Sequence, residues 1–368
     1  MSNSKEILKE LINIDSQFNK SNKEIIDYLK NFLNKFECTV YKVDNSDLDL
    51  YNLVVKIKGE SSENPLVFVG HTDTVLSNEN WSTNPFEAIE KEGKIYGLGS
   101  SDMKAGLAAM ISAVLKLDKK PSQDVYLVFD CDEEYEGKGG LDLVTKFSLE
   151  NAHIMILEPT SRKITLGQKG CIDLEIETSG ESLHSSLASI EKNEKYNANH
   201  KMIKICNDLL KYESKISKKE EGEYLSPILS LSYLSGGTGA ANTVPDKCIL
   251  RVSRRLIPSE DLEEVYKEME EIILNVDSNA KIKKLFWGAP FSTDKEEKFV
   301  THVKKIADKY FSGIDFNVTQ GWTEASLFSK WGETIIFGPG RGEMAHQADE
   351  YVYVKDLEKF EKLCFDLL

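Results

Sequence analysis

The first 167 residues combine helical and strand-like hydrophobic patterns. Apolar positions recur at helical spacing in residues 7–12 and 25–33, and a small-residue helix is predicted over 104–117. Another helix is predicted after Gly139 and Gly140. Uninterrupted apolar runs of strand length occupy 53–57, 66–69, 125–129 and 154–157. Fully apolar strands that alternate with helices predict an α/β domain with a mixed sheet covered by helices.

The pattern changes near Gly167. Residues 171–178 alternate apolar and polar side chains, as half-buried strands do. The elements predicted next are a helix over 197–212, strands near 228–234 and 247–252, and a helix over 259–274, with the charged stretch 211–223 as a solvated loop. This order predicts a small α+β, ferredoxin-like module with helices on one face.

The α/β pattern returns after residue 287. A helix is predicted near 296–310, a strand over 334–337 and a last helix from Val354. The chain therefore reads as one α/β domain, 1–167 and 286–368, which is interrupted by an inserted domain, 168–285.

Composition narrows the possible partners. The 368 residues include 46 Lys and Arg against 61 Asp and Glu, for a net charge of −15. Such a surplus of acid argues against nucleic acid and against an anionic membrane surface, but not against metal cations. The N-terminal segment is charged and amphipathic, so no secretory signal is expected. The six cysteines form no C-x-x-C pair, which is typical of reduced thiols in a cytoplasmic protein.

Ionisable residues follow four of the predicted strands. Ligands bind at the carboxyl ends of the strands in open α/β sheets, so these residues predict a site at one edge. The residues are His71 and Asp73 after the second strand, 130–134 after the third, Glu158 after the fourth, and His346 beyond the strand at 334–337.

The residue types favour a metal site. His and carboxylate ligands without cysteine suit Zn, Mn or Co. Asp73 follows His71 closely enough to support its second ring nitrogen, and the glycine-rich turn 97–102 could present Asp102 as a bridging carboxylate. Glu133 and Glu134 are adjacent, so one could bind metal while the other acts as a base. Two ions about 3.5–4 Å apart could then hold a water and a carbonyl oxygen.

Each of these features also has an ordinary interpretation. An H-x-D triplet is often a surface turn, and a Glu pair means little in an acidic chain. The glycine-rich turn could be a phosphate loop, although it lacks the G-x-x-x-x-G-K-[ST] order. Only their joint order along the chain favours the metal site.

The chain resembles the dizinc hydrolase family that contains aminoacylase, acetylornithine deacetylase, succinyl-diaminopimelate desuccinylase and carboxypeptidase G. The matching stretches are VFVGHTDTV, WSTNPF, YGLGSSDMKAGLAAM, DCDEEYEGKGG, ILEPT and FGPGRGEMAHQADEY. The resemblance implies that one zinc is held by His71, Asp102 and Glu158, and the other by Asp102, Glu134 and His346.

The resemblance also implies the catalytic roles in this centre. Asp73 would orient His71. Glu133 would take a proton from a zinc-bound water and pass it to the leaving amine.

The inserted domain carries further matches. The resemblance implies that it mediates a homodimer and that His184 of one subunit reaches the partner's active site. It also implies that Asn242 binds substrate and that Arg255, in an R-x-x-P segment, binds a substrate carboxylate. His184 could instead be a plain loop residue, and Arg255 an ion-pair partner. Ser253 stands where the family often has Asp, and Glu324, in a Thr-Glu-Ala segment, is expected to bear on specificity.

The substrate is only partly indicated. Glu rather than Asp at position 158 is typical of the family's deacylases and carboxypeptidases. Segment 345–351 is similar to acetylornithine deacetylase, whereas 237–245 is similar to the desuccinylase. We expect hydrolysis of the amide bond of an N-acyl amino acid, with N-acetylornithine as the first candidate substrate. The alternatives are the desuccinylase reaction, a di- or tripeptidase, a carboxypeptidase, or a metal-binding scaffold without catalysis.

Overall fold

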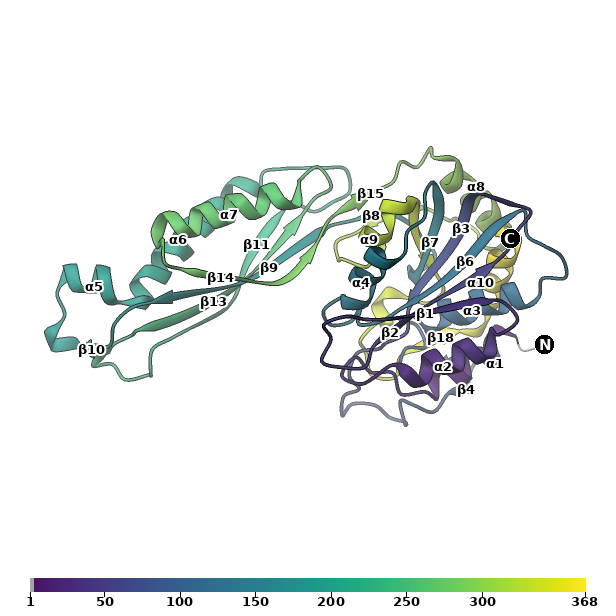
Figure 1. Ribbon diagram of the computed structural model, residues 1–368, viewed down its shortest axis with the longest axis horizontal. Coiled ribbons are helices and arrows are strands. Elements are labelled where there is room, and N and C mark those ends of the chain that lie inside the picture. Colours follow the sequence, from purple (N-terminus) through teal and green to yellow (C-terminus); the bar gives the residue numbers. More distant parts are fainter. Residues whose placement is uncertain (1–2) are drawn as a thin grey trace. The chain divides into compact units, whose positions relative to one another are not determined.

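The computed structural model describes residues 3–368 and divides into two compact units (Figure 1). The first unit comprises the described residues up to Gly167 together with Thr293–Asn317 and Thr323–Leu368. The second comprises Gln168–Ser292 and Val318–Trp322. Residues 286–292, which the sequence pattern assigned to the first domain, thus belong to the second unit. Strand β14 (Lys281–Gly288) pairs with β9 (Gly170–Ser179) as far as Gly288, which accounts for residues 286–288.

A mixed sheet forms the centre of the first unit, and its strands run in the order β1-β2-β6-β3-β7-β17-β8. Strands β6, β3, β7 and β17 run parallel to one another, whereas the pairs β1–β2, β2–β6 and β17–β8 are antiparallel. The bounds are β1 Glu37–Lys42, β2 Tyr51–Ile57, β3 Ser61–His71, β6 Gln123–Asp130, β7 Ala152–Pro159, β8 Ile164–Gln168 and β17 Gly332–Gly338. Short strands β15 (Phe291–Ser292) and β16 (Phe316–Thr319) lie where the chain passes between the units.

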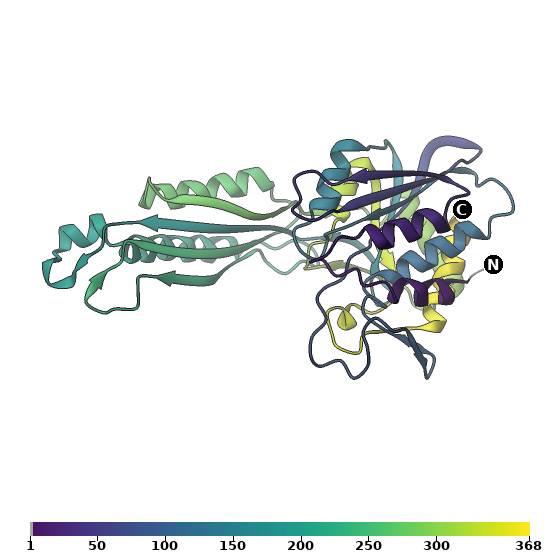
Figure 2. The same cartoon turned by 60° about the horizontal axis from the view of Figure 1, so that its bottom comes forward.

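Helices cover both faces of this sheet, which confirms the predicted α/β class (Figure 2). One layer holds α1 Ser4–Ile12, α2 Lys23–Phe32, α3 Lys104–Leu115, α8 Lys298–Tyr310 and α10 Val354–Leu367. The other holds α4 Lys138–Lys146 and α9 Ala325–Phe328. Two short 3₁₀ turns follow α9 along the chain, η2 Ser329–Trp331 and η3 Gly342–Met344.

Helix α3 is built from small apolar residues and is buried along almost its whole length. A Cβ atom at Gly106 would lie 2.5 Å from the carbonyl oxygen of Leu157, so glycine lets the helix approach β7 closely. This packing fixes the turn that precedes the helix at the end of the sheet.

A small three-stranded sheet joins two distant segments of the first unit. Its order is β18-β5-β4, with bounds β4 Ile89–Lys91, β5 Lys94–Tyr96 and β18 Tyr351–Tyr353. Tyr351 pairs with Tyr96, so the chain that follows His346 is tied to the chain that enters the glycine-rich turn.

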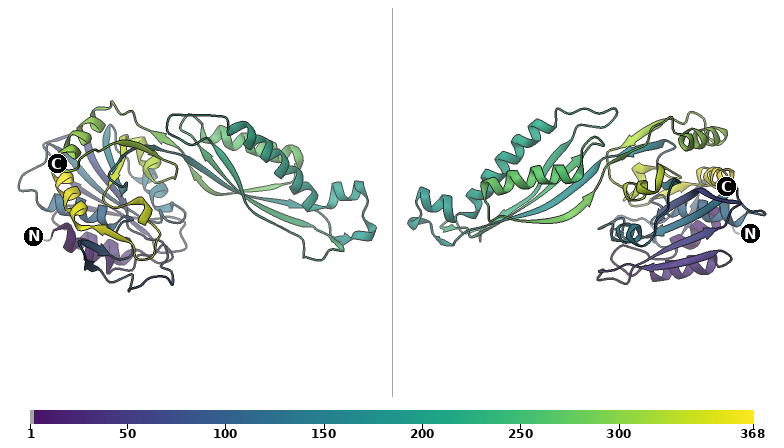
Figure 3. Two further views of the ribbon diagram at one scale, coloured as in Figure 1. Left: turned by 180° about the vertical axis from the view of Figure 1, so that it is seen from behind. Right: turned by 45° about the horizontal axis from the view of Figure 1, so that its top comes forward.

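The second unit is an antiparallel sheet, β11-β13-β9-β14, with two helices packed on one face (Figure 3). Its order along the chain is β9, α6, β11, β13, α7, β14, which is the ferredoxin-like arrangement. The bounds are α6 Ala198–Ile216, β11 Ile228–Gly236, β13 Lys247–Leu256 and α7 Leu262–Val276, with β10 Leu183–His184, η1 Ser185–Leu187, α5 Ile190–Tyr196 and β12 Thr243–Val244 in addition.

One expectation for this unit is wrong. The charged stretch 211–223 was predicted as a loop, but α6 continues to Ile216. Tyr212 and Ile216 are buried against the sheet and extend the apolar stripe of the helix. Among the described residues, no helix is both long and apolar enough to cross a membrane.

Candidate metal centre

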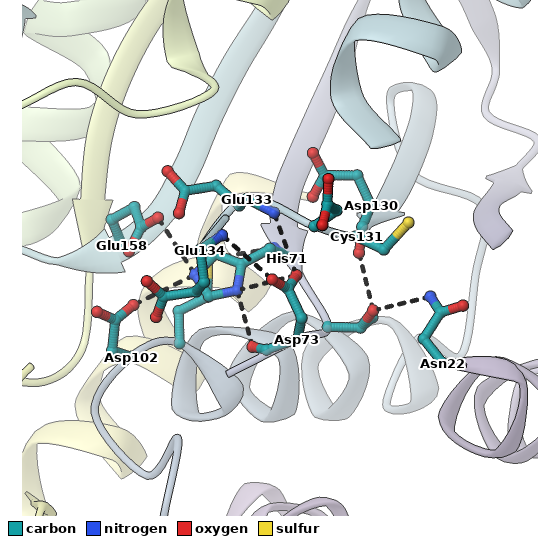
Figure 4. Close-up of polar contacts among 12 residues, drawn as sticks. Asn22, His71, Asp73, Asp102, Asp130, Cys131, Glu133, Glu134 and Glu158 are labelled. Atoms are coloured by element: carbon teal, nitrogen blue, oxygen red, sulfur yellow. Dashed lines mark hydrogen bonds and ion pairs between the residues drawn. The ribbon is translucent and has the colours of Figure 1, made fainter. Parts of the chain in front are cut away.

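The candidate site gathers at the carboxyl ends of the parallel strands (Figure 4). His71 ends β3 and is paired in register with Asp130, which ends β6. Glu158 lies one residue before the end of β7. The parallel register therefore delivers these side chains to a single edge, as the order of the motifs predicted.

The His71 ring is fully buried and points its two nitrogens at different groups. Nδ1 lies 3.0 Å from the backbone oxygen of Asp73, whereas Nε2 lies 3.3 Å from Oδ1 of Asp102 and 3.5 Å from Oε1 of Glu158. Burial lowers the pKa of His71, but the surrounding carboxylates outweigh burial and raise it well above its ordinary value. With Nδ1 facing a carbonyl, Nε2 is the nitrogen available to a cation.

Asp102 lies between two imidazoles. Its Oδ1 faces His71, and its Oδ2 lies 3.6 Å from Nε2 of His346. The same His346 nitrogen lies 2.9 Å from Oε2 of Glu134, and this contact is the main reason why the pKa of His346 is raised to about 9. His346 is also the most exposed of these groups, with 55% of its side chain accessible.

Two sets of ligand atoms result, and both contain Asp102. The atoms of His71, Asp102 and Glu158 lie within 4.8 Å of one another, and so do those of Asp102, Glu134 and His346. The structure thus brings together the five residues that the resemblance implied as zinc ligands. Their ligand role stays a prediction.

Further carboxyl groups surround these sets. Oxygens of Glu133, Glu158 and Glu324 also lie within 4.8 Å of one another. Among the described residues, the buried carboxyl oxygens of Glu324 and Asp130 have no hydrogen-bond partner. The expectation was a specificity role for Glu324, and this side chain is 1% exposed and directly precedes α9.

Burial in this acidic environment raises the pKa of several carboxyls. Burial is the largest cause, and neighbouring carboxylates add to it. The pKa values of Asp130, Glu133 and Glu158 rise well above the ordinary range, and that of Glu324 rises to about 7. In the ligand sets of the described residues, the imidazoles of His71 and His346 face this excess of carboxylate, so a bound cation would relieve the repulsion.

Asp73 contacts more than the histidine that it was predicted to orient. Its Oδ1 lies 3.7 Å from Nδ1 of His71 and accepts a hydrogen bond from the Glu133 backbone N–H at 3.4 Å. Its Oδ2 accepts the Glu134 backbone N–H at 3.1 Å. One carboxylate therefore ties the histidine to the segment that carries both glutamates.

The remaining predicted residues lie in the second unit. His184 and Asn242 are exposed and lie beside each other where two segments distant in sequence meet: His184 on β10 pairs with Thr243 on β12, and the Ser185 N–H donates to the Asn242 carbonyl. Arg255 lies on β13, on the face opposite α6 and α7, since its neighbour Arg254 is the buried one. Substrate-binding roles for these residues stay predictions.

The sequence pattern indicated no role for several buried charged groups of the first unit, among them Asp130, Lys104 and Glu350. Asp130 adjoins the predicted Glu133 and Glu134, and Glu350 follows His346 by four residues. Neither spacing reveals what the side chain contacts, because the partners are distant in sequence.

A mixed sheet with an inserted ferredoxin-like unit, together with two His–carboxylate sets that could each hold a metal ion, is the arrangement expected of a metal-dependent hydrolase. The sequence profile of peptidase family M20/M25/M40 matches residues 67–368, and the chain belongs to this family.

Relatives with several different names share this family. A probable succinyl-diaminopimelate desuccinylase of Staphylococcus aureus (strain MRSA252) is 28% identical over 99% of this chain and 97% of its own. The acetylornithine deacetylase of Buchnera aphidicola subsp. Acyrthosiphon pisum (strain Tuc7) is 29% identical over 94% and 92%. The crystal structure of a tripeptidase from Staphylococcus aureus subsp. aureus Mu50 superimposes with a TM-score of 0.75 at 20% identity, over 99% and 97% of the two chains. The last similarity concerns the fold alone.

Proposed function

We propose that the protein hydrolyses the amide bond of an N-acyl amino acid in a centre of two divalent metal ions, zinc first, with cobalt or manganese as alternatives. One observation carries the proposal. Asp102 presents one carboxylate oxygen to each of two histidines, and each histidine has a further carboxylate beside it.

The donor set fits such ions. Imidazole nitrogens and carboxylate oxygens without thiolate suit zinc, cobalt and manganese. His71, Asp102 and Glu158 would hold one ion, and Asp102, Glu134 and His346 the other. When bound, such an ion pair acidifies water and polarises an amide carbonyl.

Glu133 is the proposed general base. Its carboxyl adjoins those of Glu158 and Glu324, and burial raises its pKa well above the usual range. A carboxyl in this environment accepts a proton from water and keeps it long enough to pass it to the leaving amine. Asp73 accepts a hydrogen bond from the Glu133 backbone N–H and so fixes the position of the backbone that carries this carboxyl.

The substrate class is narrowed by the relatives' names. The desuccinylase and the deacetylase are both named for an acyl group on a diamino acid. We infer the same class here, with N-acetylornithine as the first candidate and succinyl-diaminopimelate as the second. A tripeptide or another peptide stays the alternative, since a tripeptidase shares the fold.

The second unit is the proposed binding and dimerisation domain. His184 would polarise the scissile carbonyl in the partner subunit, while Asn242 and Arg255 would bind substrate. Strand β11 is an edge of its sheet and exposes Tyr233 and Leu234, as strands that pair between subunits do. The six cysteines are free, which supports a cytoplasmic location as part of the same proposal.

The decisive variant is Glu133→Gln, with Glu136→Gln on the same loop as its control. We expect Glu133→Gln to keep its metal and to lower kcat by about 10²–10⁴-fold, because a positioned base contributes about that much. Glu136→Gln should retain activity, since Glu136 pairs with Lys138 instead.

The substrates in this assay are N-acetylornithine, succinyl-diaminopimelate, a dipeptide and a tripeptide, each with zinc or cobalt. Preference for a peptide would overturn the deacylase assignment. Wild-type protein that binds two metal ions but cleaves none of these amides would overturn the catalytic proposal itself.

A further inference from the structure

We propose that Glu350 is a positioning residue for the metal centre, which locks the turn that carries Asp102 by accepting backbone N–H groups along it. The inference rests on the proposed role of Asp102 as the shared ligand. Glu350 itself belongs to neither set of ligand atoms.

Among the described residues, the Glu350 carboxylate accepts three hydrogen bonds from backbone N–H groups. Its Oε1 accepts the N–H groups of Ser101 at 2.6 Å and Asp102 at 2.8 Å, and its Oε2 accepts the N–H of Gly99 at 2.9 Å. The carboxylate is 1% exposed, so water does not compete for these bonds. A buried acceptor with three N–H donors holds the turn in one conformation.

The backbone of Glu350 adds a fourth tie. Its carbonyl oxygen accepts the Gly97 N–H at 3.1 Å, and the next residue, Tyr351, pairs with Tyr96 across β18 and β5. Both ends of segment 346–350 therefore contact Asp102. His346 faces the Asp102 carboxylate, and Glu350 accepts a hydrogen bond from the Asp102 N–H.

The opposite side of the turn is held by Lys104. Its ammonium donates to the carbonyl oxygens of Leu11 and Ile14, at 2.9 Å each, and its backbone N–H donates to the Gly99 carbonyl at 2.9 Å. Gly99 has a φ of 78° and leaves room for the Lys104 stem, since a Cβ there would lie 3.1 Å from Cδ. The turn is thus fixed from two sides, and of Lys104 and Glu350 it is Glu350 that hydrogen-bonds to the Asp102 backbone.

A shared ligand depends on such fixation. The two oxygens of Asp102 face different histidines, so a small rotation of its backbone would spoil one contact or the other. Glutamine at 350 keeps one acceptor oxygen but presents an NH₂ donor to a backbone N–H. It therefore replaces at least one hydrogen bond with a donor–donor contact.

The test compares Glu350→Gln with Glu361→Gln in the full-length protein. Glu361 is a buried carboxylate of α10 that also accepts a backbone N–H, from Ser4, and it contacts no candidate ligand. Zinc affinity of the metal-free proteins is measured by calorimetric titration with a competing chelator, and Tm is measured without metal.

We expect Glu350→Gln to weaken zinc binding by about 10–100-fold, the usual effect of losing a group that orients a ligand. Glu361→Gln should lower Tm to a similar or larger extent while leaving zinc affinity unchanged. Glu350→Asp, which keeps the charge and both acceptor oxygens, should recover part of the affinity. Equal zinc affinities for Glu350→Gln and Glu361→Gln would overturn the inference.

If Glu350→Gln does not fold, Ser101→Ala tests whether fixation of this turn controls zinc affinity. The Ser101 hydroxyl joins the same turn to the backbone of Arg341, and its loss should weaken zinc binding by a few-fold. Unchanged affinity in this variant would then refute the positioning role. Failure of the wild type to bind two zinc ions would instead refute the proposed function, whatever the variants do.

Discussion

Two buried carboxylates, Glu260 in the second unit and Glu324 in the first, have different surroundings. In the second unit, Glu260 is 7% exposed, and its oxygens accept hydrogen bonds from Arg254 at 2.7 Å, Lys219 at 2.8 Å and a backbone N–H. In the first unit, Glu324 is 1% exposed and has no hydrogen-bond partner among the described residues. Both carboxylates are removed from water, but only Glu260 is hydrogen-bonded to cationic side chains.

The two carboxylates therefore differ in their pKa as well as in their partners. Burial raises the pKa of Glu260, but its cationic partners outweigh burial and lower it overall. Burial raises the pKa of Glu324 to about 7, and the opposing effect of His71 is smaller than that of burial. A fold tolerates such an uncompensated cluster where a bound cation completes it.

The largest expected effect is that of Asp102→Ala. Loss of the shared carboxylate should remove metal from both ligand sets and lower kcat by about 10³-fold or more. Metal content after gel filtration and the hydrolysis rate measure it together. Asp124→Asn, at a buried carboxylate of β6 that pairs with Lys56, is the control and should keep both metal and activity. A metal-loaded, active Asp102→Ala protein would contradict the proposed role of Asp102 as the shared ligand.

His184→Ala tests whether the second unit takes part in the reaction. We expect kcat to fall by about 10²-fold with metal content unchanged, because a donor to the developing oxyanion contributes roughly that much. His200→Ala, an exposed histidine on α6, serves as the matched variant and should behave as wild type. An unchanged kcat in His184→Ala would confine the chemistry to the first unit.

Arg255→Ala tests recognition of a substrate carboxylate. KM should rise by about 10–100-fold for an N-acyl amino acid, as expected for loss of a charged hydrogen bond, while kcat changes little. The C-terminal amide of the same substrate should show no such rise. Arg251→Ala, on the same face of β13 and paired with Glu175, provides the comparison. Equal effects on the acid and the amide would contradict the assignment.

The smallest expected effect is on the pH dependence of stability without metal. Glu324 has a folded-state pKa of about 7, above its ordinary value of 4.5, so between these pH values the folded state binds more protons than the unfolded chain. The free energy of unfolding must therefore fall as pH rises through this window. Tm measured from pH 5 to 8 should fall less steeply in Glu324→Gln than in wild type, by about 2–4 °C.

Glu260→Gln supplies the opposite case. The folded-state pKa of Glu260 lies below 4.5, so its contribution to stability is present above that pH and is lost only as pH falls further. This variant should lower Tm equally at pH 5 and pH 8. The pKa values of the two carboxylates would not differ in this way if Glu260→Gln changed the slope of Tm against pH, or if Glu324→Gln left that slope unchanged.

Much of the fold follows from local sequence pattern. The apolar runs at 66–69, 125–129 and 154–157 became the buried strands β3, β6 and β7, and the alternation at 171–178 became β9. The predicted helix from Val354 begins at that residue. The short strands β4, β5 and β18 escaped prediction, since three residues are too few to show a period.

The sequence by itself determined the family, the class of fold and the five candidate ligands, because hydrophobic period and motif order are local properties. Only the tertiary structure decided which oxygen of Asp102 faces which histidine, and that Glu324 is buried beside Glu133. It also decided that Glu350 holds Asp102 from 248 positions away. These contacts depend on how the strands and the α3 turn pack in space, and no periodicity along the chain encodes a distance between residues so far apart.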